Sequence, residues 1–168
     1  MDEQRTAFEF YPVRAIAFAA LALASIVGLF AQDSPPVPTV SLPANALLVE
    51  RYEWHDADTP VRAVVRLPWG VLLDEPKGLR DDSYDAWEVG ERGGADVTPE
   101  ERLKGLKAVD ALRVLSVGRS LYVAPSGRGK RDNFGRLLGS MYLVDGGGRA
   151  IRLRDWAVSN GHVRKTVK

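Results

Sequence analysis

The sequence predicts an α+β domain, mainly β, in which a small barrel of strands is capped by helices. Strand-like runs of alternating apolar and polar residues come first, a segment with helical spacing follows, and further strand-like runs precede a short closing helix. Strands and helices do not alternate along the chain, as they would in a parallel sheet. The 168 residues, 45% of them hydrophobic, can build one compact core of this kind.

The N-terminus carries a hydrophobic helix ahead of this domain. Residues 15–31 contain no charged side chain, and Arg5 and Arg14 precede them. Such asymmetry favours an N-terminus on the inner side of the membrane and a domain on the outer side. The run is long for a signal peptide and short for a membrane span, so residues 1–31 are either a cleaved signal or a membrane anchor, with a buried core helix as the third possibility. We therefore expect an extracytoplasmic protein, either secreted or anchored.

Residues 32–44 predict an extended linker, because prolines and small polar residues dominate them. The globular domain then covers residues 45–168, and we expect it to be monomeric. The chain has no cysteine, which excludes a disulfide scaffold, a cysteine nucleophile and a cysteine-based zinc site. Its two histidines leave little room for a histidine-rich metal site.

The first strands are expected over residues 47–54 and 61–67. In the second, Val61, Ala63, Val65 and Leu67 share one face and the arginines lie on the other. Residues 70–73 form a further short strand or continue the second one beyond Pro68. Residues 120–124 and 137–144 predict two later strands, separated by a polar, glycine-rich loop. A turn over residues 145–148 ends the last of them.

Two helices complete the domain. Thr98, Pro99 and Glu101 form a capping box with proline at the first helical position, and Gly118 is a suitable stop. Apolar residues recur at helical spacing between these signals, at Leu103, Leu106, Val109 and Leu112. A short amphipathic helix then begins near Leu153 and ends by Gly161.

Charge is unevenly distributed, although the formal net charge is only +1. Residues 50–101 carry 14 acidic and 6 basic side chains, and residues 125–168 carry 3 acidic and 10 basic ones. This distribution suits a cation site beside an anion-binding face, or two solvated surfaces that differ in sign.

Three short strings contain the residue types that bind metals and phosphates. Residues 56–59 read Asp-Ala-Asp-Thr, a turn with two hard oxygen ligands. Residues 80–88 place an arginine five residues before an aspartate and that aspartate three residues before a glutamate. Residues 132–136 read Asp-Asn-Phe-Gly-Arg, a turn that holds an arginine at the mouth of a strand. Each string alone is also typical of an ordinary turn.

Together and in this order, the three strings resemble the staphylococcal nuclease-like (thermonuclease) family. That family has an Asp-Gly-Asp-Thr turn, then Arg-x4-Asp-(Thr/Ala)-Pro-Glu, then Asp-(Lys/Arg)-(Tyr/Phe)-Gly-Arg. Residues 153–163 are similar to its closing helix, so the resemblance covers residues 47–164. The chain departs from the pattern at Ala57, where glycine is usual, and at Trp87, where proline is usual. These departures concern loop geometry and leave every charged group in place.

The resemblance implies an OB-fold, a five-stranded barrel, and a Ca²⁺-dependent nuclease that acts on DNA and RNA. In that role Arg80 and Arg136 clamp the phosphate as planar, bidentate donors. Glu88 orients or deprotonates the attacking water. The base-rich C-terminal half attracts the polyanion largely without sequence preference.

The resemblance also implies the ligands of Ca²⁺. They are the carboxylates of Asp58 and Asp85 and the backbone carbonyl of Ala86, with water completing the shell. Asp56 is expected close to the ion as a further acid.

Two other functions stay open. One is a catalytically inactive OB-fold module that binds nucleic acid or a protein partner. The other is an extracytoplasmic structural domain, in which the charged residues need not converge. Because both arginines and Glu88 are present, the sequence favours the enzyme.

Overall fold

The computed structural model describes residues 38–90 and 97–164. The hydrophobic helix expected at residues 15–31 and the first part of the expected linker lie outside these residues. Within the described ranges, no helix combines the length and apolar character needed to cross a membrane.

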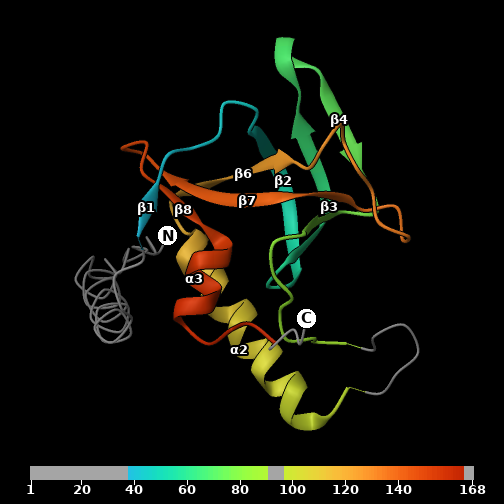
Figure 1. The fold of residues 1–168 in the computed structure, drawn as a ribbon, viewed down its shortest axis with the longest axis vertical. Coiled ribbons are helices and arrows are strands. Elements are labelled where there is room, and N and C mark those ends of the chain that lie inside the picture. The colour runs from blue at the N-terminus through green and yellow to red at the C-terminus, as the bar shows by residue number, and fades with distance from the viewer. Residues whose placement is uncertain (1–37, 91–96, 165–168) are drawn as a thin grey trace, which may run out of the picture. The chain divides into compact units, whose positions relative to one another are not determined.

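The described residues are built mostly from antiparallel strands with two helices, so the predicted α+β, mainly β, class is confirmed (Figure 1). The strands are β1 Thr39–Val40, β2 Leu47–Asp56, β3 Thr59–Arg66, β4 Leu72–Glu75, β5 Leu79–Asp81, β6 Arg119–Pro125, β7 Leu137–Asp145 and β8 Ala150–Arg152. The helices are α2 Pro99–Ser116 and α3 Leu153–Ser159. Both helices lie on the same side of the strands in Figure 1, and the β3–β4 hairpin extends away from them.

All eight strands belong to one sheet with the order β1-β8-β7-β6-β2-β3-β4. Neighbours on this path are antiparallel, whereas β5 pairs with β7 in parallel. Strand pairing does not close the described strands into a ring. Since Thr39–Val40 pairs with β8, residues that we expected in the linker contribute an edge strand.

The turn between β2 and β3 carries two of the predicted site residues. Asp56 pairs with Thr59 across this two-residue turn. Ala57 is fully buried and does not adopt the positive φ that glycine would favour there. Alanine therefore fits this turn without a positive φ, and the tip of the turn is packed into the core.

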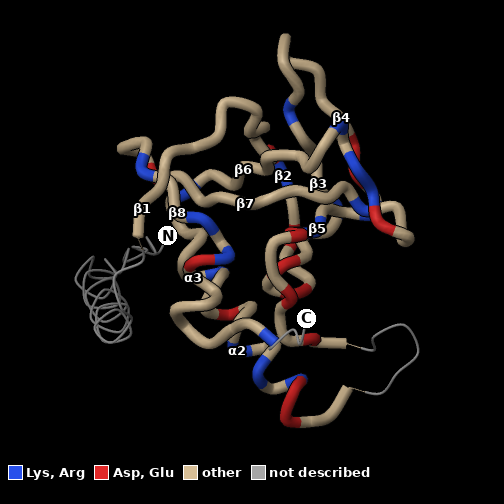
Figure 2. Tube along the Cα trace, viewed as in Figure 1, with Lys and Arg blue, Asp and Glu red and all other residues tan. Residues whose placement is uncertain are grey.

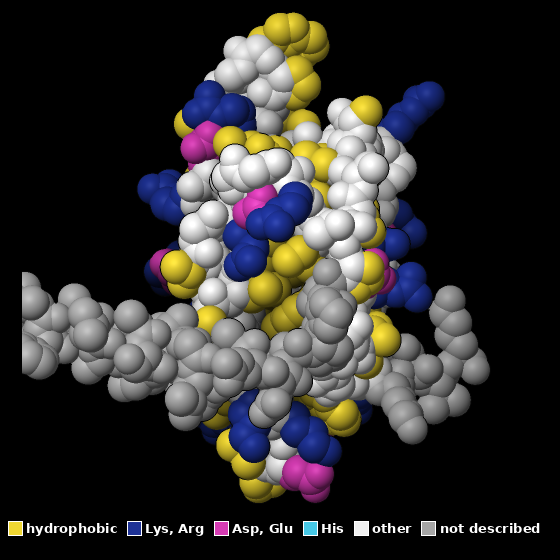
Figure 3. All heavy atoms as spheres, turned by 90° about the vertical axis from the view of Figure 1, so that its left-hand side faces the viewer, with side chains coloured by type: hydrophobic (Ala, Val, Ile, Leu, Met, Phe, Trp, Pro, Cys, Tyr) yellow, Lys and Arg dark blue, Asp and Glu magenta, His cyan; other side chains and the backbone are white. Residues whose placement is uncertain are grey.

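A single 3-10 turn at Pro68–Gly70 reverses the chain between β3 and β4, so the residues after Pro68 form a further strand that pairs with β3 and do not continue it. Trp69 in this turn has a φ of 66°, which is unusual for a residue with a side chain, and is 97% exposed. Figure 3 shows hydrophobic side chains at the tip of this hairpin, which projects from the top of the molecule in that view.

The strand β5 was not predicted, because its sequence Leu-Arg-Asp has no alternating pattern long enough to detect. Gly78 allows it to form. A Cβ at this position would lie 2.4 Å from the carbonyl oxygen of Pro60, and the φ of Gly78 is +83°. Only glycine permits this close approach of β5 to β3.

Helix α2 begins as predicted, since the Thr98 hydroxyl accepts a hydrogen bond from the Glu101 amide. The predicted apolar face is only half right. Leu103 and Leu106 are exposed, and the buried face is formed by Gly105, Ala108, Val109 and Leu112. The loop after β5 packs against Gly105, which turns the helix toward this smaller face.

The core lies between the sheet and the two helices. Its members come from five strands and both helices and include Val49, Val65, Leu79, Leu112, Leu121, Val123, Met141, Leu143 and Trp156. Burial of apolar area at this interface fixes where the strand ends and loops that carry the charged residues meet.

Candidate functional site

Arg80 is the centre of the charged cluster. Its position on β5, beside β7, directs its side chain toward the β2–β3 turn. Its Nη1 donates to Oδ1 of Asp58 at 2.8 Å, and its Nη2 donates to Oδ1 of Asp85. One guanidinium group therefore bridges two of the predicted metal ligands.

Asp58 is the most enclosed acid of the cluster, with 1% of its surface exposed. Its Oδ1 also accepts a hydrogen bond from the Thr59 hydroxyl at 2.7 Å, and its Oδ2 accepts one from the Ala86 amide at 2.6 Å. Burial raises the pKa of this carboxyl group, although Arg80 and the Ala86 amide act in the opposite direction. The Asp58 carboxylate therefore depends on adjacent cations and donors to remain charged.

The Thr59 hydroxyl connects the two predicted phosphate-binding arginines. Nη1 of Arg80 and Nη1 of Arg136 each lie 3.3 Å from its oxygen. Arg136 comes from the end of the β6–β7 loop, far from Arg80 in the sequence. The structure thus brings both arginines to the same edge of the β2–β3 turn.

Arg136 is held in place by its own loop. Its Nε donates to Oδ2 of Asp132 at 2.7 Å, while Oδ1 of Asp132 accepts from the Arg136 amide at 2.9 Å. Burial would raise the pKa of Asp132, but the hydrogen bonds and charge of Arg136 lower it overall. The exposed ring of Phe134 lies 5.4 Å from the guanidinium carbon, within the range of a cation–π contact.

Glu88 and Asp56 lie on the loop side of the cluster. Burial disfavours the charged form of Arg80, but the negative charges of Asp58, Asp85 and Glu88 raise its pKa overall. Glu88 is therefore close enough to Arg80 to interact with it. Oδ1 of Asp56 accepts a hydrogen bond from the Val89 amide at 3.0 Å, so this acid braces the loop that carries Glu88.

The C-terminal residues pin the loop that contains Asp85 and Ala86. The Arg164 amide donates to the Asp85 carbonyl at 2.8 Å, and Ala86 forms a β-bridge with Val163. Trp87, at the position where the thermonuclease-like pattern has proline, donates from its Nε1 to the Gly161 carbonyl at 3.3 Å. This loop is therefore anchored by contacts to the residues after α3 instead of by a proline ring.

Several residues that shape the cluster were not assigned a role from the sequence. Thr59 and Asp132 lie inside the quoted strings, so their positions in the motifs were the available signal. Asp81 and Tyr84 also lie within residues 80–88, but at positions that the pattern leaves variable, so the motif gave no signal for them.

Asp81 and Tyr84 fix the start of the loop after β5. Asp81 is fully buried, and its two oxygens accept hydrogen bonds from the Ser83 amide and the Met141 amide, each at 2.9 Å. Burial raises the pKa of Asp81 to about 6. The Tyr84 hydroxyl donates to the Ala57 carbonyl, and burial raises its pKa well above its ordinary value. Together they tie the loop to β7 and to the β2–β3 turn.

The donor set fits Ca²⁺ in chemical type. Asp58, Asp85 and the Ala86 carbonyl offer only oxygen ligands, which Ca²⁺ prefers. No group of three or more His, Cys, Asp or Glu side chains assembles within residues 38–90 and 97–164, so carbonyl and water ligands would have to complete the shell. Arg80 lies against both carboxylates, and a bound cation would share them with it.

Charge is distributed in space much as it is in the sequence. Figure 2 shows acidic positions gathered below β5 and basic positions in the loop between β6 and β7. The cluster around Arg80 lies where these regions meet. A pocket of about 330 Å³ opens elsewhere, between the β3–β4 hairpin and the β6–β7 loop.

No protein-family model, no curated protein and no solved structure matches this chain. The thermonuclease-like resemblance therefore stays a prediction from its three motifs.

Proposed function

We propose that this chain is a Ca²⁺-dependent nuclease that hydrolyses phosphodiester bonds of DNA or RNA with little sequence specificity. The observation that carries the proposal is the convergence of Arg80 and Arg136 on the Thr59 hydroxyl, beside Asp58 and Asp85. Three segments that are distant in sequence supply these side chains. A purely structural role for the domain would not require that they meet.

The two arginines suit phosphodiester chemistry. Attack on phosphorus builds negative charge on the phosphoryl oxygens, and fixed cations stabilise that charge. Guanidinium groups offer paired donors that match two phosphate oxygens. Asp85 and Asp132 hold Arg80 and Arg136 in fixed orientations, which limits the reorganisation needed when phosphate binds.

Ca²⁺ would be held by Asp58, Asp85 and the Ala86 carbonyl, with Asp56 close by. When bound, the ion supplies positive charge that polarises the phosphoryl group. Burial raises the pKa of Asp58, so a second adjacent cation would favour the charged form of this carboxyl group.

Glu88 is the group that would orient or deprotonate the attacking water. Its charge acts on Arg80, so it borders the place where the phosphate would bind. The hydrogen bond from the Val89 amide to Asp56 holds the loop that carries Glu88 against the β2–β3 turn. A carboxylate beside the reacting phosphorus can take the proton that water loses on attack.

We also propose that the sheet is an OB-like, five-stranded barrel. The strands β4 and β5 follow one another and act as one bent strand, of which the first half pairs with β3 and the second half with β7. The Asp81 amide donates to the Asp58 carbonyl at 2.9 Å, which adds one bond between β5 and the β2–β3 turn. These contacts support a barrel of β2, β3, β4–β5, β7 and β6.

An extracytoplasmic location and a monomeric state complete the proposal. The uncharged run at residues 15–31 and the arginines before it support the location. Protease protection of the full chain in spheroplasts would show whether the domain is outside the membrane, and light scattering would report its mass.

A second candidate is a binding module without catalytic activity. One observation favours this candidate: Arg80 forms ion pairs with both Asp58 and Asp85. Such a pairing neutralises the acids without a metal. The module would bind nucleic acid equally well with and without Ca²⁺.

The deciding experiment is a cleavage assay on the full chain. Single-stranded and double-stranded DNA and RNA are each incubated with the protein, in Ca²⁺ or in a Ca²⁺ chelator, beside the Glu88→Gln variant. The nuclease predicts cleavage that needs Ca²⁺ and is lost in the variant. Binding without cleavage under every condition would support the module, and cleavage that survives full chelation would contradict the proposed mechanism.

A further inference from the structure

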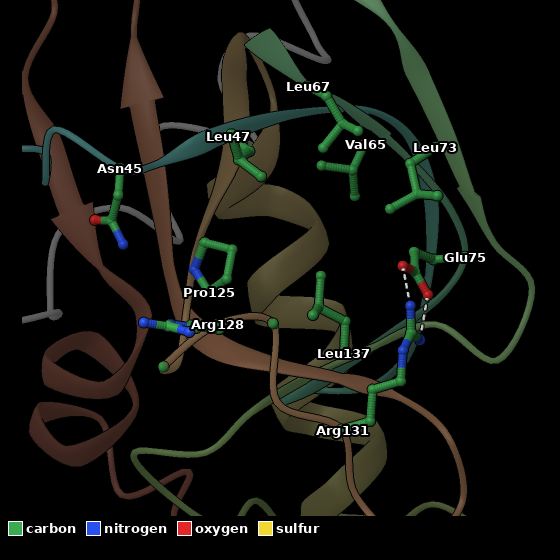
Figure 4. A pocket seen from close by; sticks show the side chains of 12 residues that line it. Asn45, Leu47, Val65, Leu67, Leu73, Glu75, Pro125, Arg128, Arg131 and Leu137 are labelled. Carbon is green, nitrogen blue, oxygen red and sulfur yellow. Dashed lines mark hydrogen bonds and ion pairs between the residues drawn. The ribbon is translucent and has the colours of Figure 1, made fainter.

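The pocket of about 330 Å³ has mostly apolar walls. Figure 4 shows Val65, Leu67 and Leu73 on one side of it, with Leu47 and Pro125 across from them. Ligand pockets range from roughly 300 to 1,000 Å³, so this one suits an occupant of a single ring system. Asn45 stands at its edge with an amide that can both donate and accept hydrogen bonds.

One end of the pocket is charged. Glu75 is 1% exposed, and its two oxygens accept hydrogen bonds from Nη1 and Nη2 of Arg131 at 2.7 Å each. Arg131 also donates from Nη1 to the Gly135 carbonyl at 2.8 Å. The ion pair therefore ties the β6–β7 loop to β4 at one end of the pocket.

The same loop connects the pocket to the charged cluster. Arg128 and Arg131 line the pocket, and Arg136 ends the loop at the Thr59 hydroxyl. Leu137 lines the pocket and directly follows Arg136 in the chain. The exposed Lys130 lies between the two pocket arginines in sequence. A polyanion bound at Arg136 would thus follow a basic loop to the mouth of the pocket.

We propose that this pocket takes one unpaired nucleobase of a single-stranded polynucleotide whose backbone follows the β6–β7 loop to Arg136. The inference rests on the proposed function and adds to it a preference for single strands. Apolar walls suit the faces of a base, while Arg128 and Lys130 suit the adjoining phosphates.

A duplex would not use the pocket in the same way. Its bases are stacked and paired, and moving one into a pocket requires unstacking it first. A single strand already presents unpaired bases. Because every base has an apolar face, the pocket would discriminate by strandedness more than by sequence.

The test uses two neighbouring leucines of β4. Leu73 lines the pocket, whereas Leu72 points to the opposite face of the strand and does not line it. Leu73→Trp fills the pocket, and Leu72→Trp adds the same bulk outside it. Binding of a dye-labelled homothymidine strand, alone or annealed to its complement, is followed by fluorescence anisotropy on the full chain in chelator, so that no cleavage intervenes.

We expect Leu73→Trp to weaken single-strand binding by about tenfold or more, because the filled pocket no longer admits a base, and Leu72→Trp to leave it unchanged. Duplex binding should change little in either variant. Equal affinities of the two variants for the single strand would overturn the pocket assignment. If thermal unfolding shows that Leu73→Trp does not fold, Leu73→Ala against Leu72→Ala makes the same comparison, with weaker binding expected only from the former.

The outcomes separate this inference from the proposed function. A wild-type chain that cleaves nucleic acid while both tryptophan variants bind as it does would overturn the pocket alone. A wild-type chain that neither binds nor cleaves any strand would overturn both.

Discussion

The hydroxyl of Thr59 is within hydrogen-bond distance of three groups of the cluster. It donates to Asp58 and lies 3.3 Å from Nη1 of both Arg80 and Arg136. At 2% exposure it has no water to replace these partners. A buried polar group whose partner is removed costs about 1–3 kcal/mol, so this single atom contributes to stability as well as to the site.

Replacing this hydroxyl gives the first prediction. Thr59→Val preserves the branched shape and removes the oxygen, so we expect lower nuclease activity and a lower unfolding temperature. Thr59→Ser restores the oxygen and should recover most of the activity. Turnover and thermal unfolding of the three proteins provide the measurement. A valine variant as active as the serine variant would show that the hydroxyl does not position the arginines.

Glu88→Gln separates catalysis from binding. The change removes the base and one negative charge, so nucleic-acid affinity should be unchanged or slightly stronger. The rate should fall by roughly 10²-fold or more, the usual scale for a lost general base. Single-turnover cleavage and anisotropy measure the two quantities separately. If the variant cleaves as fast as the parent, Glu88 is a bystander and the spacing from Asp85 to Glu88 is a coincidence.

Substitutions of two basic residues, Arg136 and Lys130, should affect rate and affinity differently from Glu88→Gln. Arg136→Lys keeps the charge but loses the planar donor pair, so it should reduce rate more than affinity. Lys130→Ala lies outside the cluster and should weaken binding while leaving turnover at saturation nearly unchanged.

His162 gives stability a dependence on pH. Burial lowers its pKa from 6.5, and its ring packs 4.9 Å from that of Trp156. Below about pH 6.5 the unfolded chain binds a proton more readily than the folded one, so the free energy of unfolding should decrease as pH falls, until the folded-state pKa is passed. Urea unfolding of the parent and His162→Gln between about pH 7.5 and pH 5 measures this. A parent no more pH-sensitive than the variant would contradict it.

At the scale of elements, α2 and the loop that carries Glu88 are in direct backbone contact. A Cβ on Gly105 would lie 2.5 Å from the Glu88 carbonyl oxygen and 2.9 Å from that of Trp87. Glycine inside a helix costs about 1 kcal/mol relative to alanine. Glycine is nevertheless required at this position, because the close approach of the loop leaves no space for a side chain.

Gly105→Ala should therefore lower activity, although alanine is the better helix former. The added methyl group forces the Glu88 backbone to shift, which moves the carboxylate relative to Arg80. Gly90→Ala is the matched control, since Gly90 has open space around its Cβ position. Cleavage rates and circular dichroism of both variants give the result, and equal rates would mean that the loop relaxes without moving Glu88.

The elements show where sequence patterns suffice and where they fail. Long strands and the capped start of α2 follow from local alternation and from side-chain capping, which the sequence contains. The strand β5 is three residues long and is stabilised by β7 and by Gly78, so its own sequence carries no signal. Likewise, α2 turns toward Gly105 because of the loop that packs on it, a tertiary contact that helical spacing does not reveal.

At the scale of the whole molecule, binding should weaken steeply as salt rises. The basic β6–β7 loop and the C-terminal bases would release counterions from a bound polyanion. Removing one phosphate contact with Lys130→Ala should reduce the slope of log affinity against log salt by about one. Anisotropy at several salt concentrations tests this. A flat response in the parent would mean that the polymer does not lie on the basic face.

The candidate site was predictable as a set of residues but not as an arrangement. Motif order indicated that Asp58, Arg80, Asp85 and Arg136 act together, and the structure brings their side chains into one network. Nothing local in the sequence indicated that Arg80 would bridge both carboxylates. The buried supports at Asp81 and Tyr84 also depend on long-range packing, which a single sequence does not show.

The parallel pairing of β5 with β7 determines the order in which parts of the chain can fold during synthesis. It joins Leu79 to Leu137, so the chain between them must be synthesised before Arg80 can settle beside Asp58 and Arg136. Contacts between residues so distant in sequence require a large loop to close and form slowly. While the chain is still emerging, the hairpin of β2 and β3 can fold without the cluster. A nascent chain would therefore bring Arg80 and Arg136 together only after β7 has formed, and the loop that carries Asp85 would be pinned later still, by the residues that follow α3.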